Sequence, residues 1–307
     1  MKTTIDYLAF RSKGEPRQVL EALKPMMGAL GSSMTIKSLP RGAMGFQQAA
    51  EIGVSNLPFA RLDFGGESQR GWVRTVIKGQ GCEWVDDWDA LEQLEKLPCS
   101  EVRRLDIALT TWNGEITHDT VVNAHAAGQF ETGGRPPALR QITSSDPRDG
   151  RTCYVGKREK SLKFFRAYEK GFQMLQGIRI PGICTHIDDH LVEDIYRCEV
   201  ELKATGDSLP IGWDVIERRD EYFAGSYPFC SQVLPGVEAD ILMRRKERKP
   251  QMDLAAALNN CCIQFGPTLF TALAAYHGDM TAVWDKVIAK HHCQSLLEAG
   301  VLLVDHD

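Results

Sequence analysis

The sequence predicts an α+β protein, with a largely antiparallel central sheet flanked by helices and a small helical domain at the C-terminus. Strand-like segments dominate the chain up to residue 235, whereas the pattern from residue 252 onward is helical. A Pro-Gly pair at 235–236 and the charged run Arg244–Lys249 separate the two regions. We therefore expect a larger domain at 1–235 and a helical domain at 236–307.

The expected elements follow in order along the chain. Segments rich in β-forming residues predict strands at 3–10, 57–64, 71–77, 102–112, 152–156, 162–168 and 195–204. Apolar residues recurring three and four positions apart predict helices at 16–30, 87–97, 119–127 and 211–222. The second domain is predicted to be helical over 252–304, with breaks at Gly266–Pro267, Gly278 and Gly300. We recognise no internal repeat in the sequence.

Composition and charge restrict the class of function. A hydrophobic content of 43% and a charged content of 25% over 307 residues are ordinary for a soluble globular protein. The net charge of -5 argues against a protein that coats nucleic acid non-specifically, but it allows a local basic groove. We expect no secretory signal, no membrane partner and, from nine cysteines without a C-x-x-C pair, reduced thiols in the cytoplasm.

Tyr168 stands between two cations on a predicted strand. Because side chains alternate faces along a strand, Arg166, Tyr168 and Lys170 would point the same way. The flanking cations would favour the phenolate of a tyrosine whose ordinary pKa is about 10, and they would attract a phosphate. The triplet is a candidate for nucleophilic chemistry; the alternative is a basic strand with one packed or solvated tyrosine.

Acidic residues on two further predicted strands form a second candidate set. Glu199 and Glu201 lie two residues apart on one strand face and repel each other unless a cation is near. Asp106 stands in an otherwise apolar run and needs a partner or a metal. Mg²⁺ and Mn²⁺ prefer such oxygen ligands. The alternatives are surface pairs with Arg197 and Lys203 and a structural, hydrogen-bonded Asp106.

The segment from Arg148 to Lys170 is basic although the chain is acidic overall. It holds eight Lys or Arg residues against three acids, with Phe164 and Phe165 between them. Such a mixture is typical of a surface that grips phosphates and stacks bases, and a solvated hairpin is the alternative. The predicted DNA contacts are Arg151, Lys157, Arg158, Lys160 and Lys163.

His186 and His190 are four residues apart, a spacing that a helix would place on one face. A zinc site, and with it a metallohydrolase, is one interpretation. The segment lacks the glutamate general base of an H-E-x-x-H motif, so we favour a surface loop.

The tyrosine and the acids together suit phosphoryl transfer from a nucleic-acid backbone. A metal on the carboxylates would polarise the scissile phosphate. Tyr168 would attack phosphorus and keep the chain covalently attached. Arg166 and Lys170 would contact the phosphate or lower the pKa of the phenol.

Three blocks of the sequence resemble the replication initiation factor family, the rolling-circle initiators of filamentous phages and small plasmids. These blocks are Arg104–Ala108, Cys153–Lys170 and Tyr196–Lys203. They are similar to the family's acidic strand, its Tyr-x-Gly-x-Arg…Arg-x-Tyr-x-Lys block and its Arg-x-Glu-x-Glu-Leu-Lys strand. Ile5–Tyr7 is similar to the family's opening strand, so the resemblance spans residues 1 to 205.

The resemblance implies a metal-dependent DNA endonuclease and strand transferase, with residues 1–235 as its nicking and joining domain. The family's nucleophile falls on Tyr168, which would form a 5′-phosphotyrosine link and leave a 3′-hydroxyl as primer. Its metal ligands, for Mg²⁺ or Mn²⁺, fall on Asp106, Glu199 and Glu201. The implied substrate is single-stranded or supercoiled origin DNA, and we consider a host helicase and a second copy of the chain as further partners.

One position departs from the family pattern. The family often carries a further Asp four positions after the first, and this chain has Thr110 there. A non-catalytic DNA-binding replication regulator is therefore the alternative function.

Overall fold

A ten-stranded sheet forms the framework of the first of two compact units, Met1–Met243 and Arg244–Asp307. The computed structural model describes residues 2–55, 57–159, 161–176, 185–204, 211–240 and 254–292. Helices accompany the sheet, so the predicted α+β class is confirmed. The functional division at residue 235 stays a prediction, and each unit is described by itself.

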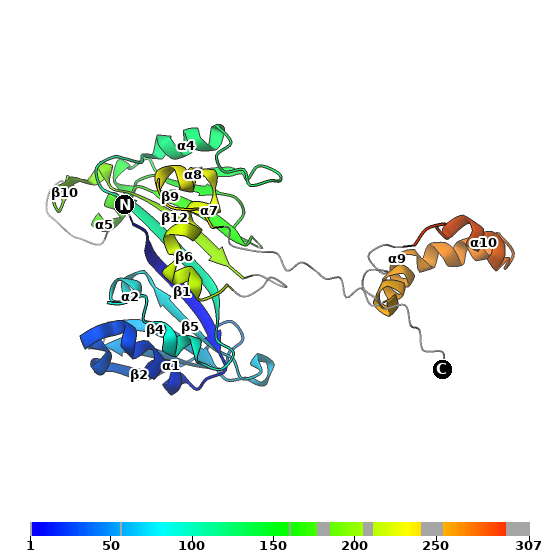
Figure 1. Ribbon diagram of the computed structural model, residues 1–307, viewed down its shortest axis with the longest axis horizontal. Helices are drawn as coiled ribbons and strands as arrows, with labels where there is room; N and C mark the ends of the chain where they lie inside the picture. The colour runs from blue at the N-terminus through cyan, green and yellow to red at the C-terminus, as the bar shows by residue number, and fades with distance from the viewer. Residues whose placement is uncertain are drawn as a thin grey trace. The chain divides into compact units, whose positions relative to one another are not determined.

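Neighbouring strands of the large sheet run antiparallel, in the order β2-β3-β4-β5-β1-β6-β12-β9-β8-β7 (Figure 1). The strands are β1 (Thr4–Ser12), β2 (Met34–Leu39), β3 (Gln48–Val54), β4 (Leu57–Phe64), β5 (Val73–Lys78), β6 (Glu101–Thr111), β7 (Leu139–Ile142), β8 (Thr152–Val155), β9 (Lys163–Tyr168) and β12 (Tyr196–Lys203). A separate hairpin consists of β10 (His186–Ile187) and β11 (His190–Leu191). Every predicted strand is present, but β2, β3 and β7 were not predicted.

Three of the four helices predicted for the first unit are shorter or divided, whereas the helix predicted at 119–127 keeps its length and is shifted by one residue. The helices of the first unit are α1 (Pro16–Leu23), α2 (Gly79–Glu83), α3 (Glu92–Glu95), α4 (His118–Ala126), α5 (Lys170–Leu175), α6 (Asp214–Glu217), α7 (Arg219–Ser226) and α8 (Pro228–Val233). Pro16 and a capping box between Glu15 and Gln18 begin α1. The predicted continuation to residue 30 is instead a 3-10 segment, Lys24–Ser33, in which Gly28 has a φ of 50°.

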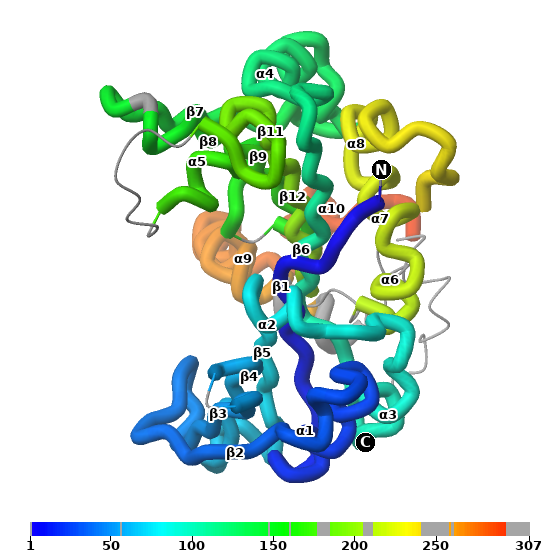
Figure 2. Tube along the Cα trace, turned by 90° about the vertical axis from the view of Figure 1, so that its left-hand side faces the viewer, coloured from blue at the N-terminus to red at the C-terminus, as the bar shows by residue number. Residues whose placement is uncertain are grey.

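One face of the large sheet is apolar and carries the core. Leu8 and Phe10 of β1 and Leu105 and Ile107 of β6 are fully buried on this face. Alternation along each strand places these side chains on the same side. Helices α6, α7 and α8 lie beside β1 and β6 on one side of the sheet (Figure 2). Their buried side chains, together with those of α1, join the same hydrophobic cluster.

The opposite face of the sheet is lined by polar side chains. On β6 this face carries Arg104, Asp106 and Thr110, and on β12 it carries Glu199 and Glu201. Because the other face is committed to the core, these polar groups must pair with one another or meet solvent. The candidate site is built on this face, which we call the open face.

The second unit is helical within its described part. It contains α9 (Leu254–Ala275) and α10 (Met280–Val287). The predicted break at Gly266–Pro267 is wrong, because α9 continues through Pro267. The predicted break at Gly278 is confirmed, and Gly300 lies outside the described residues.

The seven cysteines among the described residues are all free thiols. No described helix has both the length and the hydrophobicity that crossing a membrane requires.

Phe130 is a specific test of the core. Its ring is 1% exposed and lies 4.8 Å from Phe165, 5.1 Å from Phe229 and 5.4 Å from Tyr227, centroid to centroid. We expect Phe130→Ala to lower the free energy of unfolding by about 3–5 kcal/mol, through lost burial and the cavity left behind. Urea denaturation checks this, with exposed Met44→Ala as the control; equal stabilities for the two variants would contradict the packing described.

Candidate active site on the open face

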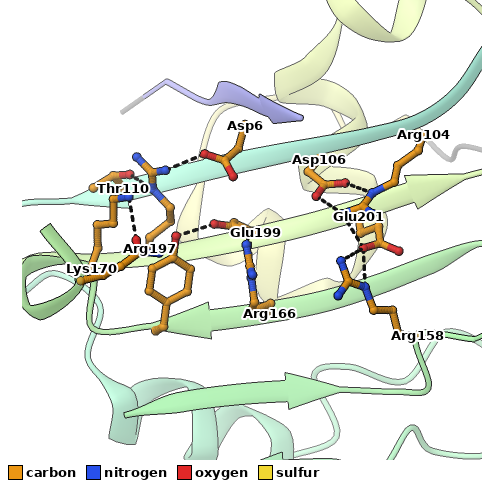
Figure 3. Close-up of polar contacts among 12 residues, drawn as sticks. Asp6, Arg104, Asp106, Thr110, Arg158, Arg166, Lys170, Arg197, Glu199 and Glu201 are labelled. Carbon is orange, nitrogen blue, oxygen red and sulfur yellow. Dashed lines mark hydrogen bonds and ion pairs between the residues drawn. The ribbon is translucent and has the colours of Figure 1, made fainter. Parts of the chain in front are cut away.

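Three adjacent strands bring the predicted catalytic residues together. In the register of β12 with its neighbours, Glu201 lies opposite Asp106, Glu199 opposite Arg166, and Arg197 opposite Tyr168. The five side chains other than Tyr168 share the open face of the sheet (Figure 3), and alternation along β9 places Tyr168 on the same face as Arg166. Residues from three separate segments of the chain are therefore cross-strand neighbours, within reach of direct contact.

Tyr168 donates a hydrogen bond to Glu199. The phenol Oη lies 2.6 Å from Glu199 Oε1, and the two residues are only 7% and 3% exposed. The other carboxylate oxygen, Oε2, accepts from Arg166 Nε at 2.9 Å. Both oxygens of Glu199 are thus engaged, one by the candidate nucleophile and one by a guanidinium.

The expected activation of Tyr168 by flanking cations is wrong for this structure. Burial, the charge of Glu199 and the hydrogen bond to it raise the pKa of Tyr168, outweighing the opposite effect of Arg197 and Arg166. The phenol is therefore protonated at neutral pH and needs a proton acceptor in order to attack.

Lys170 lies near Tyr168, as predicted, but on a helix rather than on the same strand. It is the first residue of α5 rather than a strand residue, because β9 ends at Tyr168. Its ammonium is 5.9 Å from the centroid of the Tyr168 ring, and the Arg166 guanidinium is 5.2 Å from it. Burial and the charge of Arg197 lower the pKa of Lys170.

Asp106 and Glu201 share one cation, Arg104. Its Nη2 lies 2.5 Å from Asp106 Oδ2 and 2.9 Å from Glu201 Oε2. Glu201 also pairs with Arg158 and Lys203, each at 2.9 Å. Burial acts to raise the pKa of Glu201, but the bonds from Lys203 and Arg158 outweigh it and lower the pKa. For Asp106, burial dominates over Arg104 and raises the pKa to about 6.

Arg197 contacts both Thr110, the position that departs from the family pattern, and Asp6 on the first strand. Its Nε donates to Thr110 Oγ1 at 2.8 Å, and its Nη1 lies 2.9 Å from Asp6 Oδ1. The position where an acid was expected therefore holds a hydroxyl that accepts from a guanidinium. Asp6, which the sequence placed on the opening strand, supplies the nearby carboxylate.

The carboxylates do not gather into one cluster around a single point. Within the described ranges, no group of three His, Cys, Asp or Glu side chains could hold a metal ion. The pair Asp106 and Glu201 nevertheless fits a hard divalent cation in donor type, because two buried carboxylates converge there on one positive group. Arg104 now provides that positive charge, so a metal at this pair would require the guanidinium to move.

The predicted DNA-binding cations have different positions. Arg158 is half-exposed beside Glu201, and Lys157 is exposed. Arg151 pairs with Glu169 at 2.8 Å and lines a depression of about 210 Å³ that Arg166 and Tyr168 also line. Lys160 lies outside the described residues.

Lys163 faces away from Tyr168. It alternates with the open-face residues of β9, and its ammonium donates to the Ser226 carbonyl and lies 4.5 Å from the Tyr227 ring centroid. The structure thus places it on the helix-covered face, away from Arg166 and Tyr168, which contradicts the prediction that Lys163 is a DNA contact.

His186 and His190 lie on the β10–β11 hairpin rather than on a helix. In this pairing each histidine lies opposite an aliphatic residue, Leu191 or Ile187, and not opposite the other histidine. His190 Nδ1 lies 3.0 Å from Asn113 Oδ1, and its ring lies 5.2 Å from Trp112. The sequence favoured a surface loop here, and the structure has a short two-stranded hairpin instead.

The sequence profile of the replication initiation factor family matches residues 100–255, about half of the chain. The chain belongs to this family. The match covers β6, β9 and β12, the strands that carry Asp106, Tyr168 and Glu199, and the chain's role is that of a replication initiator.

A solved structure shares the fold of this replication initiator. It is a rolling circle replication initiator protein from Geobacillus stearothermophilus, with 19% sequence identity and a TM-score of 0.54. The similarity covers 78% of this chain and 99% of that chain. No curated protein was found to match.

Asp106 makes stability depend on pH. The folded protein holds this proton more tightly than the unfolded chain, so Asp106 contributes stability below about pH 4 that is lost as the pH rises through about 6. We expect the unfolding free energy of metal-free protein to fall more over this range than that of Asp106→Asn, by about 3 kcal/mol at most. Urea titrations in chelator test this; identical pH dependence in both proteins would contradict it.

Proposed function

We propose that this replication initiator starts rolling-circle replication by nicking one DNA strand at the origin with Tyr168. The observation that carries the proposal is the 2.6 Å hydrogen bond from the phenol of Tyr168 to the buried carboxylate of Glu199, flanked by Arg166. A nucleophile, its proton acceptor and a cation for the phosphate are thus adjacent on one strand face. The family membership and the shared fold support the same function.

Glu199 is the proton acceptor in this mechanism. As Tyr168 Oη bonds to phosphorus, the phenol proton passes to Glu199 Oε1 along the existing hydrogen bond. The bond from phosphorus to the 3′-oxygen breaks, and that oxygen takes a proton from solvent to become the 3′-hydroxyl primer. The 5′-phosphate stays on Tyr168. In the later joining step a 3′-hydroxyl attacks this phosphotyrosine and releases its proton to solvent. The bond from phosphorus to Tyr168 Oη breaks, and Glu199 returns its proton to the phenol oxygen.

Arg166 and Lys170 stabilise the charge that develops on the phosphate. Arg166 is about one-third exposed, so its guanidinium can reach an incoming phosphate while it remains paired with Glu199. Lys170 approaches the Tyr168 ring from α5. Both groups are held before the substrate arrives, which lowers the cost of organising them in the transition state.

A divalent metal ion completes the proposed site. Mg²⁺ or Mn²⁺, when bound, would polarise the scissile phosphate. Asp106 and Glu201 would hold it, in place of the charge that Arg104 now supplies. Glu199 was also predicted as a metal ligand, but we propose that it accepts the proton of Tyr168 instead. Its Oε1 already accepts from Tyr168 and its Oε2 from Arg166.

The proposed substrate is single-stranded or supercoiled origin DNA. Arg158, Lys157 and Arg151 flank the site and would contact its phosphates. We propose that the protein acts on this DNA in the cytoplasm. Its proposed partners are a host helicase and a second copy of the chain.

A non-catalytic DNA-binding replication regulator is the second candidate. One observation favours it: Asp6, Asp106, Glu199 and Glu201 are each already paired with an arginine. Such pairing neutralises the acids without a metal. DNA binding with no cleavage in Mg²⁺ or Mn²⁺ would identify this function.

Tyr168→Phe removes only the hydroxyl that the proposal makes the nucleophile. We expect it to abolish nicking of supercoiled origin DNA and the denaturant-resistant protein–DNA adduct, because no other atom of the side chain can attack phosphorus. The matched control is Tyr154→Phe, which removes a phenol from the neighbouring strand β8. Normal nicking by the Tyr168 variant would refute the assignment.

The two glutamates of β12 have separable roles. Glu199→Gln should slow nicking by about 10²–10⁴-fold at every Mn²⁺ concentration, because the amide cannot accept the phenol proton. Glu201→Gln should raise the Mn²⁺ concentration needed for half-maximal rate and approach the normal rate at saturation. Initial rates over a Mn²⁺ titration distinguish the two, and recovery of Glu199→Gln at high Mn²⁺ would reassign Glu199 to the metal.

A further inference from the structure

The two halves of the large sheet follow the same path. In the first, β1 leads to α1 and then to β2, β3, β4 and β5; in the second, β6 leads to α4 and then to β7, β8, β9 and β12. From the centre outward the strand orders are β1-β5-β4-β3-β2 and β6-β12-β9-β8-β7. Because β1 and β6 pair antiparallel in the middle, an approximate two-fold axis relates the halves. The topology is duplicated, although the sequence shows no repeat.

The strand registers align the two halves residue by residue. Strands β5 and β12 both end on a lysine, Lys78 and Lys203. Two positions before each lysine, Val76 of β5 pairs with Ala9 of β1, and Glu201 of β12 pairs with Asp106 of β6. Four positions before each lysine, Arg74 of β5 pairs with Asp63 of the outer neighbour β4. In the same way, Glu199 of β12 pairs with Arg166 of its outer neighbour β9.

The first half lacks every proposed catalytic group at the aligned positions. Ala9 stands for Asp106, Val76 for Glu201 and Arg74 for Glu199. Gly65, two residues beyond Asp63, stands for Tyr168 and has a φ of +74°. The ion pair is kept with its charges exchanged: Arg74 Nη1 lies 2.9 Å from Asp63 Oδ2, where the second half pairs Arg166 with Glu199. This half has the architecture of the nicking unit without its chemistry.

Cations replace the acids on the open face of this half. Arg61, Arg74 and Arg11 are 36%, 27% and 35% exposed, and Lys78 is exposed at the end of β5. Asp63, which pairs with Arg61 and Arg74, is completely buried, and Glu101, which pairs with Arg11, is 17% exposed, so each of these arginines is more exposed than the acid it pairs with. Beside them, Arg11 lies 4.0 Å and Lys13 5.4 Å from the Trp72 ring.

We propose that this basic surface, formed by Arg11, Lys13, Arg61, Arg74 and Lys78, is a second, non-catalytic DNA site that binds the phosphate backbone of duplex DNA beside the nick. The proposal rests on the proposed nicking function of the second half. A continuous sheet joins the two surfaces, with five inter-strand steps from β4 to β9. At ~4.8 Å a step these span roughly 24 Å, the length of about seven base pairs, so one DNA molecule can contact both. The flat strand face and the row of cations fit phosphates, which carry no sequence information.

The test reverses two exposed charges of the basic surface in the full chain. Lys13→Glu with Lys78→Glu should weaken binding to a duplex of about 40 base pairs at least tenfold and reduce the slope of log affinity against log salt by about two. The matched control, Arg17→Glu with Lys96→Glu, makes the same charge change on α1 and next to α3, on the helix-covered side. It should change the affinity less than threefold. Fluorescence anisotropy in chelator measures binding without cleavage.

The outcomes separate this inference from the proposed function. Equal loss in the two double variants, or wild-type affinity in the Lys13/Lys78 variant, overturns the second site. Failure of the wild-type chain to bind the duplex overturns it as well. Adduct formation on a short single strand that the wild-type protein cleaves should be unchanged in the Lys13/Lys78 variant. If the wild type binds duplex through these lysines but forms no adduct, the second site stands and the nicking proposal fails.

Discussion

Pairing of buried acids with cations on the open face is the constraint on which the rest of the site depends. Glu199 is 3% exposed and Asp106 4% exposed, and a carboxylate so buried is stable only with strong donors beside it. Arg166 and Tyr168 provide them for Glu199, and Arg104 provides them for Asp106. The same requirement that stabilises the fold therefore places a phenol and a carboxylate 2.6 Å apart, which is the arrangement that the proposed chemistry uses.

The sheet makes this arrangement possible because one of its faces is apolar and packs in the core, whereas the other is polar. Helices and aromatic side chains fill the apolar face, where Phe130, Phe165 and Phe229 pack together. The open face is then free to vary in charge while the core stays unchanged. Its two halves differ in this way: Asp106, Glu199 and Glu201 of the second half correspond to Ala9, Arg74 and Val76 of the first.

Much of the second half could be predicted from the sequence, because β6 and β12 alternate strictly and carry acids at fixed spacing. The strands that carry Tyr168, Asp106 and the two glutamates were each predicted, and the resemblance to the family rests on the same residues. The bond from Tyr168 to Glu199 could not be predicted, since it depends on a cross-strand register between segments 31 residues apart. Without it, the flanking cations suggested a lowered pKa, whereas burial and Glu199 raise it.

Other misses have equally specific causes. Strands β2 and β3 have mixed burial and contain small residues such as Ala49 and Gly53, so their alternation is weak. Lys163 resembled its basic neighbours, but the parity of β9 places it on the helix-covered face. The duplicated topology was not recognised from the sequence, because the aligned open-face residues differ in chemical type, as Ala9 and Asp106 or Arg74 and Glu199 do.

Mapping the covalent adduct decides whether Tyr168 is the nucleophile. The protein is incubated with a labelled single-stranded origin oligonucleotide and Mn²⁺, digested with trypsin and analysed by mass spectrometry. Cleavage after Arg166 and Lys170 isolates the peptide from Ala167 to Lys170, whose only hydroxyl-bearing side chain is that of Tyr168. This peptide is expected to carry the 5′-phosphate of the cleaved strand. An adduct on any other peptide, or cleavage without an adduct, would contradict it.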